Sequence, residues 1–280
     1  MNTNLEKKSR LEIEKSLIKK YRKDIWSKFI KAIKEYELIG EGDKVAVAIS
    51  GGKDSLLLAK LLQELQQHGP RSIELEFIAM DPGYARENRI RLEENCKHLG
   101  IPLQIFDTDV FAVADKIAGE YPCYMCARMR RGALYAKAKE LGCNKLALGH
   151  HFNDVIETTM LNLLCAGSYK TMMPKLFSDN FKGIQIIRPL YLIREEMIIR
   201  WIRWTGVEAL DCACRVASKK LGSQRARIKQ LIEELGADFR NVDISIFRSA
   251  QNVNLDMVLG YQQRGEKHFF LEGYEDWKKN

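Results

Sequence analysis

The 280-residue sequence has no run of the roughly 18 consecutive apolar residues that a membrane-spanning helix requires. Its first ten residues, MNTNLEKKSR, include four charged side chains where a secretory signal would need an apolar stretch. It also has no internal repeat and no flexible linker, so any domain boundary is a soft one. These absences predict a cytoplasmic protein with no membrane partner.

Acidic residues are in short supply. The 37 Asp and Glu residues face 45 Lys and Arg residues, and the resulting net charge of +8 favours a polyanionic partner. Eleven basic and three acidic residues lie between Lys7 and Lys34, and eleven basic and four acidic residues lie between Lys182 and Lys229. The first tract is either a solvated helix face or a nucleic-acid contact surface, and the sequence alone favours neither.

Cysteine is limited to seven residues, and the odd number argues against a complete disulfide framework. In a chain without an export signal, the close pairs Cys123/Cys126 and Cys212/Cys214 are typical of metal or redox sites. The other three, which stand in apolar helical or pre-strand surroundings, are expected to be buried and without a role: Cys96, Cys143 and Cys165.

The order of apolar patterns predicts an α/β fold with a parallel sheet flanked by helices. Residues 5–39 read as one basic helix, with an apolar stripe formed by Leu11, Ile18, Ile25, Phe29 and Ile33. Short apolar strands then alternate with helices, which places ligands at the carboxyl ends of the strands. The predicted strands are 45–49, 73–80, 103–106, 145–149 and 184–187, and the predicted helices between them are 56–65, 84–99, 128–141 and 152–165.

The segment Ser50-Gly51-Gly52-Lys53-Asp54-Ser55 connects the first strand to a helix. Backbone N–H groups, two hydroxyls and a lysine in one turn are suited to phosphate. The segment lacks the Walker A spacing, and an ordinary glycine-rich connection is the less favoured alternative.

Two further motifs carry candidate ligands. Cys123-Tyr124-Met125-Cys126 precedes a basic helix, and its thiols could form half of a zinc site, a redox dithiol or part of a cluster, or stand together by chance. The loop that starts at Gly149 continues through His150 and His151 to Asp154, which could cap the next helix or approach Mg²⁺. The two histidines are more often structural than zinc ligands in such a place, because no third ligand is suitably spaced.

The glycine turn resembles the signature of the PP-loop ATP pyrophosphatases, whose fold is like that of the adenine nucleotide alpha hydrolases. Members of that family split ATP between the α- and β-phosphates and adenylate a substrate. The resemblance implies that the turn holds pyrophosphate and that Asp54 is associated with Mg²⁺. The residues expected to bind ATP are Ala48, Ser50, Gly51, Gly52, Lys53, Asp54, Ser55, Met80 and Gly149.

The segments CYMCARMRRGALY, LALGHHFND, PKLFSDN and IIRPL narrow the resemblance to the TtcA-type tRNA 2-thiocytidine synthetases. In that family three cysteines hold a 4Fe-4S cluster with one iron open. Carried over to this chain, the ligands are Cys123, Cys126 and Cys212. In the related 2-thiouridine synthetases, residues that correspond to Arg130 and Asp154 are needed for activity, so the expected catalytic residues are Asp54, Arg130 and Asp154.

The chain departs from the family at the third cysteine. The family shows C-x-x-C followed at once by G-S-Q, whereas this chain reads Asp211-Cys212-Ala213-Cys214 and reaches Gly222-Ser223-Gln224 after an insertion. Cys214 is therefore an alternative ligand, and if both cysteines bind, a structural zinc site or a closed cluster follows. Residues 1–40 contain no cysteine, which argues against the branch that carries terminal zinc fingers.

The resemblance implies an ATP-dependent tRNA sulfurtransferase that adenylates C2 of a cytidine, at position 32 of the anticodon loop, and replaces its oxygen with sulfur. The expected sulfur donor is a cysteine desulfurase persulfide or sulfide, and a homodimer is a further expectation. The alternatives are another PP-loop tRNA-modifying enzyme, either a 2-thiouridine synthetase or a lysidine-type ligase, and a non-enzymatic RNA-binding protein. The expected division is a basic helical extension at 1–39, an ATP-binding and catalytic domain at 40–190, and a helical, basic region at 191–280 with the third cysteine and tRNA contacts.

Overall fold

The computed structural model describes residues 7–108, 122–178, 183–210, 222–272 and 274, and for residues 122–128 and 222–223 it describes the backbone alone. Among these residues, no helix is long and apolar enough to cross a membrane.

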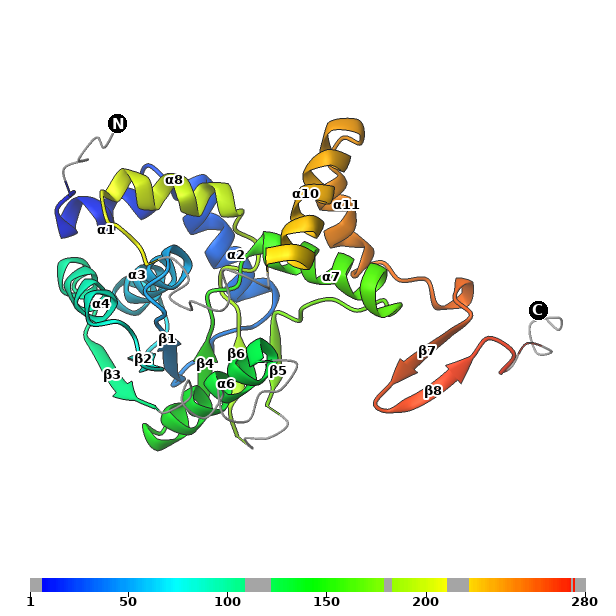
Figure 1. Cartoon of the computed structure of the whole chain (residues 1–280), viewed down its shortest axis with the longest axis horizontal. Coiled ribbons are helices and arrows are strands. Elements are labelled where there is room, and N and C mark those ends of the chain that lie inside the picture. The colour runs from blue at the N-terminus through cyan, green and yellow to red at the C-terminus, as the bar shows by residue number, and fades with distance from the viewer. Residues whose placement is uncertain (1–6, 109–121, 179–182, 211–221, 273, 275–280) are drawn as a thin grey trace.

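A six-stranded sheet forms the centre of the molecule, in the order β3-β2-β1-β4-β6-β5 (Figure 1). The pairs β1–β2, β2–β3, β1–β4 and β4–β6 are parallel, as the alternating pattern predicts. The strand β5, which the sequence pattern did not predict, pairs antiparallel with β6 at one edge. The bounds are β1 Lys44–Ala48, β2 Glu74–Asp81, β3 Leu103–Asp107, β4 Lys145–Ala147, β5 Lys175–Phe177 and β6 Gln185–Ile187.

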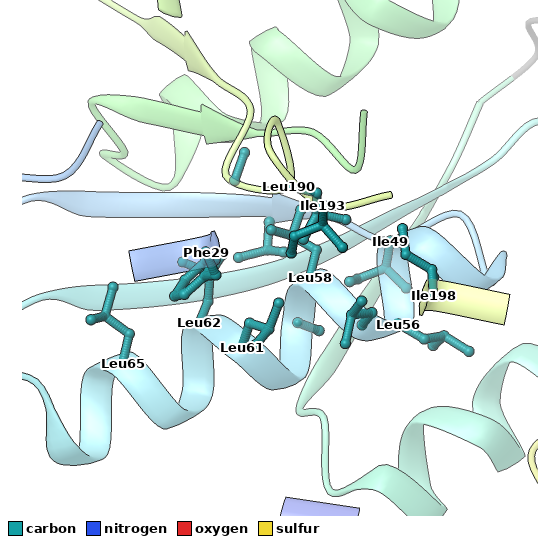
Figure 2. Close-up of a cluster of buried hydrophobic side chains, with 14 of the residues drawn as sticks. Phe29, Ile49, Leu56, Leu58, Leu61, Leu62, Leu65, Leu190, Ile193 and Ile198 are labelled. Carbon is teal, nitrogen blue, oxygen red and sulfur yellow. The ribbon is translucent and has the colours of Figure 1, made fainter. Parts of the chain in front are cut away.

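Helices cover both faces of the sheet. On one face lie α3 (Lys53–His68), α4 (Arg86–Leu99) and α8 (Glu195–Thr205), and on the other lies α6 (Pro122–Glu140). Figure 2 shows the larger apolar cluster, in which the leucines of α3 meet Phe29, Ile193 and Ile198. The helix α7 (Phe152–Ala166) follows β4 and carries α10 (Gly222–Asp238) and α11 (Val242–Ser249) on its outer side.

The N-terminal segment is not the single helix that its periodicity suggests. It consists of α1 (Arg10–Ile18), a π-helical turn η1 (Arg22–Trp26) and α2 (Ser27–Glu35). The buried stripe recurs at every fourth residue. On an α-helix, that spacing shifts the stripe by about 40° around the axis at each step. The wider π turn brings the stripe back toward the core. Its members are Ile13, Leu17, Tyr21, Ile25, Phe29 and Ile33, whereas the expected member Leu11 is 59% exposed and Ile18 is only partly buried.

The expectation of a helical region from residue 191 onward is wrong for its last part. After α11 the chain makes a short 3₁₀ turn, η2 (Leu255–Met257), and then a hairpin of β7 (Gly260–Gln263) and β8 (Glu266–Phe269). Arg264 and Gly265 form the two-residue turn with φ of 51° and 91°. Two positive φ values are the signature of the type I′ turn that matches the twist of a tight hairpin.

Candidate active site

The carboxyl ends of β1 and β4 meet at the glycine turn. Because β1 and β4 are parallel neighbours, the loops that follow them lie side by side. Gly149, just after β4, sits so close that a Cβ there would be 3.2 Å from the backbone nitrogen of Ser55. Gly51 has a φ of 80°, and a Cβ there would be 2.6 Å from Leu210 Cδ1. The positive φ of Gly51 favours glycine there, and the close approach of the Asp54–Ser55 backbone favours glycine at position 149.

The turn is arranged by its own hydroxyl groups. Ser55 Oγ donates to the Gly52 carbonyl oxygen at 2.9 Å, and Gly52 N–H donates to Ser50 Oγ at 3.3 Å. Gly52 precedes α3 and has no side chain with which to cap it, so the first N–H groups of α3 are available to an anion. The turn and the helix start together form an anion site of the kind that phosphate occupies.

A cavity of about 320 Å³ opens beside this turn. Six of the nine residues expected to bind ATP line it, together with the expected catalytic residues Arg130 and Asp154, while Gly51, Gly52 and Lys53 are not part of the lining. Arg130 comes from α6 on the opposite face of the sheet, and Asp154 comes from the first turn of α7. The lining residues are Ala48, Ile49, Ser50, Asp54, Ser55, Met80, Tyr84, Arg130, Leu134, Leu148, Gly149, His150 and Asp154.

Asp54 has one engaged oxygen and one free oxygen. Its Oδ2 accepts a hydrogen bond from Lys53 Nζ at 3.0 Å. Its Oδ1 is buried and has no hydrogen-bond partner among the described residues. An orphaned carboxylate oxygen in the wall of a phosphate-sized cavity is a donor of the kind that Mg²⁺ prefers, so the residues present fit that ion.

Asp154 caps α7. Its Oδ2 accepts the His151 backbone N–H at 2.9 Å, and its Oδ1 accepts a hydrogen bond from Arg225 Nη2 at 2.7 Å. Of the two roles considered for Asp154, the capping role is the one that this geometry fulfils. Both oxygens of Asp154 accept hydrogen bonds, whereas only Oδ2 of Asp54 does among the described residues.

Two histidines lie in the loop that follows β4. Burial lowers the pKa of His150 to about 4, and the nearby positive charge of Arg188 acts in the same direction. His151 is 5% exposed, and its Nε2 lies 3.8 Å from Asp54 Oδ1. Within the described part of the chain, no three His, Cys, Asp or Glu side chains come together as a metal site.

Two carboxylates that sequence reasoning missed connect the site to α10. Glu195 accepts hydrogen bonds from Lys53 and from Lys229, and Glu157 accepts one from Arg225. Burial alone would raise the pKa of Glu195, but its hydrogen bonds to Lys229 and Lys53 outweigh that effect and lower it to about 2. Arg225, a member of the basic tract between Lys182 and Lys229, contacts Asp154 and Glu157.

The cysteines divide into three groups. Cys123 and Cys126 lie in the first two turns of α6, and Cys126 precedes the cavity residue Arg130 by four positions, about 6 Å along the helix axis. Cys212 and Cys214 lie outside the described residues. Leu210, just before that segment, donates its N–H to the Gly51 carbonyl oxygen at 2.9 Å.

Of the remaining cysteines, two are buried as expected, and burial raises the pKa of Cys96 to about 12 and of Cys143 to about 11. Cys165 is exposed, contrary to expectation, because it lies in the last turn of α7, where Leu163 and Leu164 are exposed as well.

Comparison with known proteins identifies the family of this chain. Residues 22–233 match the family model described as the PP-loop domain. The chain is 37% identical to the tRNA-cytidine(32) 2-sulfurtransferase of Pelobacter propionicus over 84% of this chain and 87% of that protein. It is 39% identical to the enzyme of the same name from Citrifermentans bemidjiense, over 80% of this chain and 88% of that protein.

Among solved structures, the U34-tRNA thiolase NcsA from Methanococcus maripaludis, with its [4Fe-4S] cluster, superposes with a TM-score of 0.66 at 25% identity. The match covers 80% of this chain and 76% of the thiolase. On the family match, the extent of the sequence identity and the shared fold, the chain belongs to the tRNA-cytidine(32) 2-sulfurtransferase family of PP-loop proteins.

Proposed function

We propose that this chain adenylates C2 of a cytidine in the tRNA anticodon loop, cytidine 32, and replaces the oxygen there with sulfur. One observation carries the proposal: a single cavity joins the glycine turn to Arg130, on the helix that begins with the Cys-x-x-Cys pair. Oxide is a poor leaving group, and conversion of the C2 oxygen to an adenylate lets AMP depart in its place. ATP cleavage and sulfur transfer therefore need one shared space.

The residues of the turn have distinct tasks in the ATP half of the reaction. The N–H groups at the start of α3 bind the phosphates that leave as pyrophosphate. Asp54 Oδ1 would hold Mg²⁺, which when bound offsets phosphate charge. Arg130 faces the same cavity from the opposite side and stabilises the negative charge that builds up as the bond between the α- and β-phosphates breaks.

Cys123, Cys126 and Cys212 would hold the 4Fe-4S cluster, which when bound supplies an open iron for the sulfur atom. Two observations support the fit: Arg130, one turn after Cys126, lines the cavity, and Leu210, two residues before Cys212, is hydrogen-bonded to Gly51 of the glycine turn. The neutral ring of His150 in the cavity wall adds no positive charge beside the reacting base.

A 2-thiouridine synthetase is the second candidate, because the thiolase with a TM-score of 0.66 acts on U34. The sulfur donor, the homodimer, the cytoplasmic location and the division at residues 39 and 190 stay predictions. The basic tract of α1 to α2 stays a predicted tRNA contact. In the later tract, Arg200 and Arg203 are exposed and available for that role, whereas Arg225 is engaged within the site.

Mass spectrometry of nucleosides from digested tRNA tests the proposal in cells with and without the gene. Deletion should remove 2-thiocytidine and leave 2-thiouridine unchanged, and the reverse pattern would favour the second candidate. Complementation with Asp54→Ala or Cys123→Ala should fail, while Cys165→Ala, an exposed cysteine outside the site, should restore the modification. Unchanged 2-thiocytidine after deletion would contradict the proposal.

In the purified protein, Asp54→Ala should stop AMP release, and Cys123→Ala should lose iron while the chain stays folded.

A further inference from the structure

Glu195 stands between the glycine turn and α10. Its Oε1 lies 3.1 Å from Lys53 Nζ, and its Oε2 lies 2.6 Å from Lys229 Nζ. The Glu195 side chain is 17% exposed and Lys53 is 26% exposed, so their contact is partly sheltered from water, whereas Lys229 is 43% exposed and its contact is more open to solvent. One carboxylate thus connects the lysine of the turn to a helix that begins 169 residues later in the sequence.

Both ends of this connection are firmly placed. The backbone N–H of Glu195 donates to Asn153 Oδ1 at 3.0 Å, which joins the start of α8 to the start of α7. Lys229 follows Ile228, which is 5% exposed and packs with Phe152 of α7 in a small apolar cluster. Neither partner can drift without disturbing the packing beneath it.

A second connection runs beside the first. Arg225, one helical turn before Lys229, donates Nη2 to Asp154 at 2.7 Å and Nε to Glu157 at 2.7 Å. Residues four apart lie on the same face of a helix, so one face of α10 is directed at the site. Lys53 is thereby tied to α10 through Glu195, and Asp154 is tied to it directly.

The number of donors on Lys53 indicates what this arrangement does. An ammonium group has three N–H donors, and Asp54 and Glu195 accept two of them. One donor is left for an incoming phosphate, and its direction is set because the other two are occupied. The contact with Glu195 also shares the charge of Lys53, and Asp54 Oδ1 has no hydrogen-bond partner in the described part of the chain.

We infer that Glu195 is a positioning residue for ATP, which orients Lys53 toward the phosphates and is itself held in place by Lys229 of α10. The inference rests on the proposed function in one respect, that ATP is the ligand of the turn. Neither the family resemblance nor the sequence motifs assign a role to Glu195 or Lys229.

The test uses the purified full-length chain with ATP and Mg²⁺, with binding measured by calorimetry and ATP cleavage by AMP release. Glu195→Gln keeps the size of the side chain and removes its charge, and it should weaken ATP binding and raise the KM for ATP by about tenfold. Lys229→Met should act in the same direction more weakly, and Lys229→Arg should restore most of the loss. The matched control is Arg227→Met, because Arg227 lies on the same helix and pairs with Glu234 instead.

A purely structural role is separated by a double-mutant cycle. In a Lys53→Met background, Glu195→Gln should have little further effect on ATP binding, because the group that it positions is gone. A general folding defect would instead lower the active fraction and the apparent kcat, leave the KM unchanged, and add fully to the effect of Lys53→Met.

The outcomes also separate this inference from the proposed function. A wild-type chain that binds no ATP would overturn both. A wild-type chain that binds ATP, with Glu195→Gln binding it equally well or with fully additive effects, would overturn the role of Glu195 and leave the proposed function standing.

Discussion

The two parts of the chain that follow residue 221 behave in opposite ways. The helices α10 and α11 are closely packed, with Ile228 and Ile232 5% and 8% exposed and Phe247 at 5.0 Å from the ring of Phe152. The hairpin of β7 and β8 projects from the body (Figure 1), and its Phe269 is 51% exposed. The hairpin region contains apolar side chains, but they are exposed, as is Leu259 beside it at 75%.

This difference shows that apolar composition does not by itself determine burial in this region. An apolar side chain stabilises the fold only where another element offers a matching surface. The outer side of α7 offers such a surface to α10 and α11, and it also presents Asp154 and Glu157 to Arg225. The helices therefore belong to the site, and the hairpin should not.

The largest contrast should appear in stability. Ile228→Ala leaves a cavity in the cluster with Phe152 and should lower the free energy of unfolding by about 3 kcal/mol. The matched change Leu259→Ala removes an exposed side chain and should cost less than about 0.5 kcal/mol. Urea unfolding followed by circular dichroism measures both. Equal losses would show that the hairpin is packed in solution.

Local patterns explain which parts of the fold could be predicted from the sequence. The strand, glycine turn and helix between Val45 and Leu65 were predicted in type and order, because each leaves a contiguous signature, although α3 begins at Lys53, within the predicted turn. The strand β5 was missed because Lys175–Phe177 has only two apolar residues in a row, whereas the equally short β4 and β6 lie in segments with three apolar residues, at 146–148 and 184–187. The hairpin was missed because its turn is Arg264-Gly265 and lacks the usual Asn-Gly or Asp-Gly pair.

The site itself was only half predictable. Asp54 and Arg130 stand in motifs, and the structure brings them to one cavity. Glu195 has no motif, because its partners Lys53 and Lys229 lie 142 positions before it and 34 positions after it. The contacts of Arg225 were not predicted for the same reason, since a basic tract in the sequence does not show which of its members face carboxylates. Only the folded chain supplies such pairs.

The second contrast concerns two arginines. The Glu157 side chain is 8% exposed and accepts a hydrogen bond from the Arg225 guanidinium. Arg225→Met removes that guanidinium and leaves a buried carboxylate without its partner. We expect ATP cleavage to fall about tenfold and the free energy of unfolding to fall by about 2 kcal/mol, less than for a fully buried pair because Arg225 is itself 45% exposed. Arg264→Met at the tip of the hairpin is the control and should change neither. AMP release and urea unfolding are the measurements, and an unaffected Arg225 variant would remove α10 from the site.

The third contrast concerns acid stability. The pKa of Glu195 is lowered to about 2 from an ordinary value of 4.5, so its contribution is complete above about pH 4.5 and is lost as the pH falls toward 2. The pKa values of Lys53 and Lys229 are raised, so both stay charged throughout this range. The free energies of unfolding of wild type and Glu195→Gln should therefore differ by about 2 kcal/mol near neutral pH, after allowance for solvent screening. The two values should converge in acid. Urea unfolding at about pH 6 and about pH 3 checks the sign. Glu266→Gln on the hairpin, an exposed glutamate, should show no such convergence.

The smallest effect is expected when the hairpin is removed altogether. A chain that ends at Asn252 loses β7 and β8 but keeps α10, α11 and the whole described lining of the cavity. Residues 253–280 carry four basic and five acidic side chains, so their loss barely changes the charge that attracts a polyanion. We expect the free energy of unfolding to change by less than about 0.5 kcal/mol, and ATP affinity and tRNA affinity to stay within about twofold. Calorimetry with ATP and Mg²⁺ and gel shifts with tRNA measure these quantities.

If tRNA affinity fell while ATP affinity held, the hairpin would be a contact for the substrate. Stacking on unpaired bases would then explain why the aromatic side chains of the hairpin are exposed.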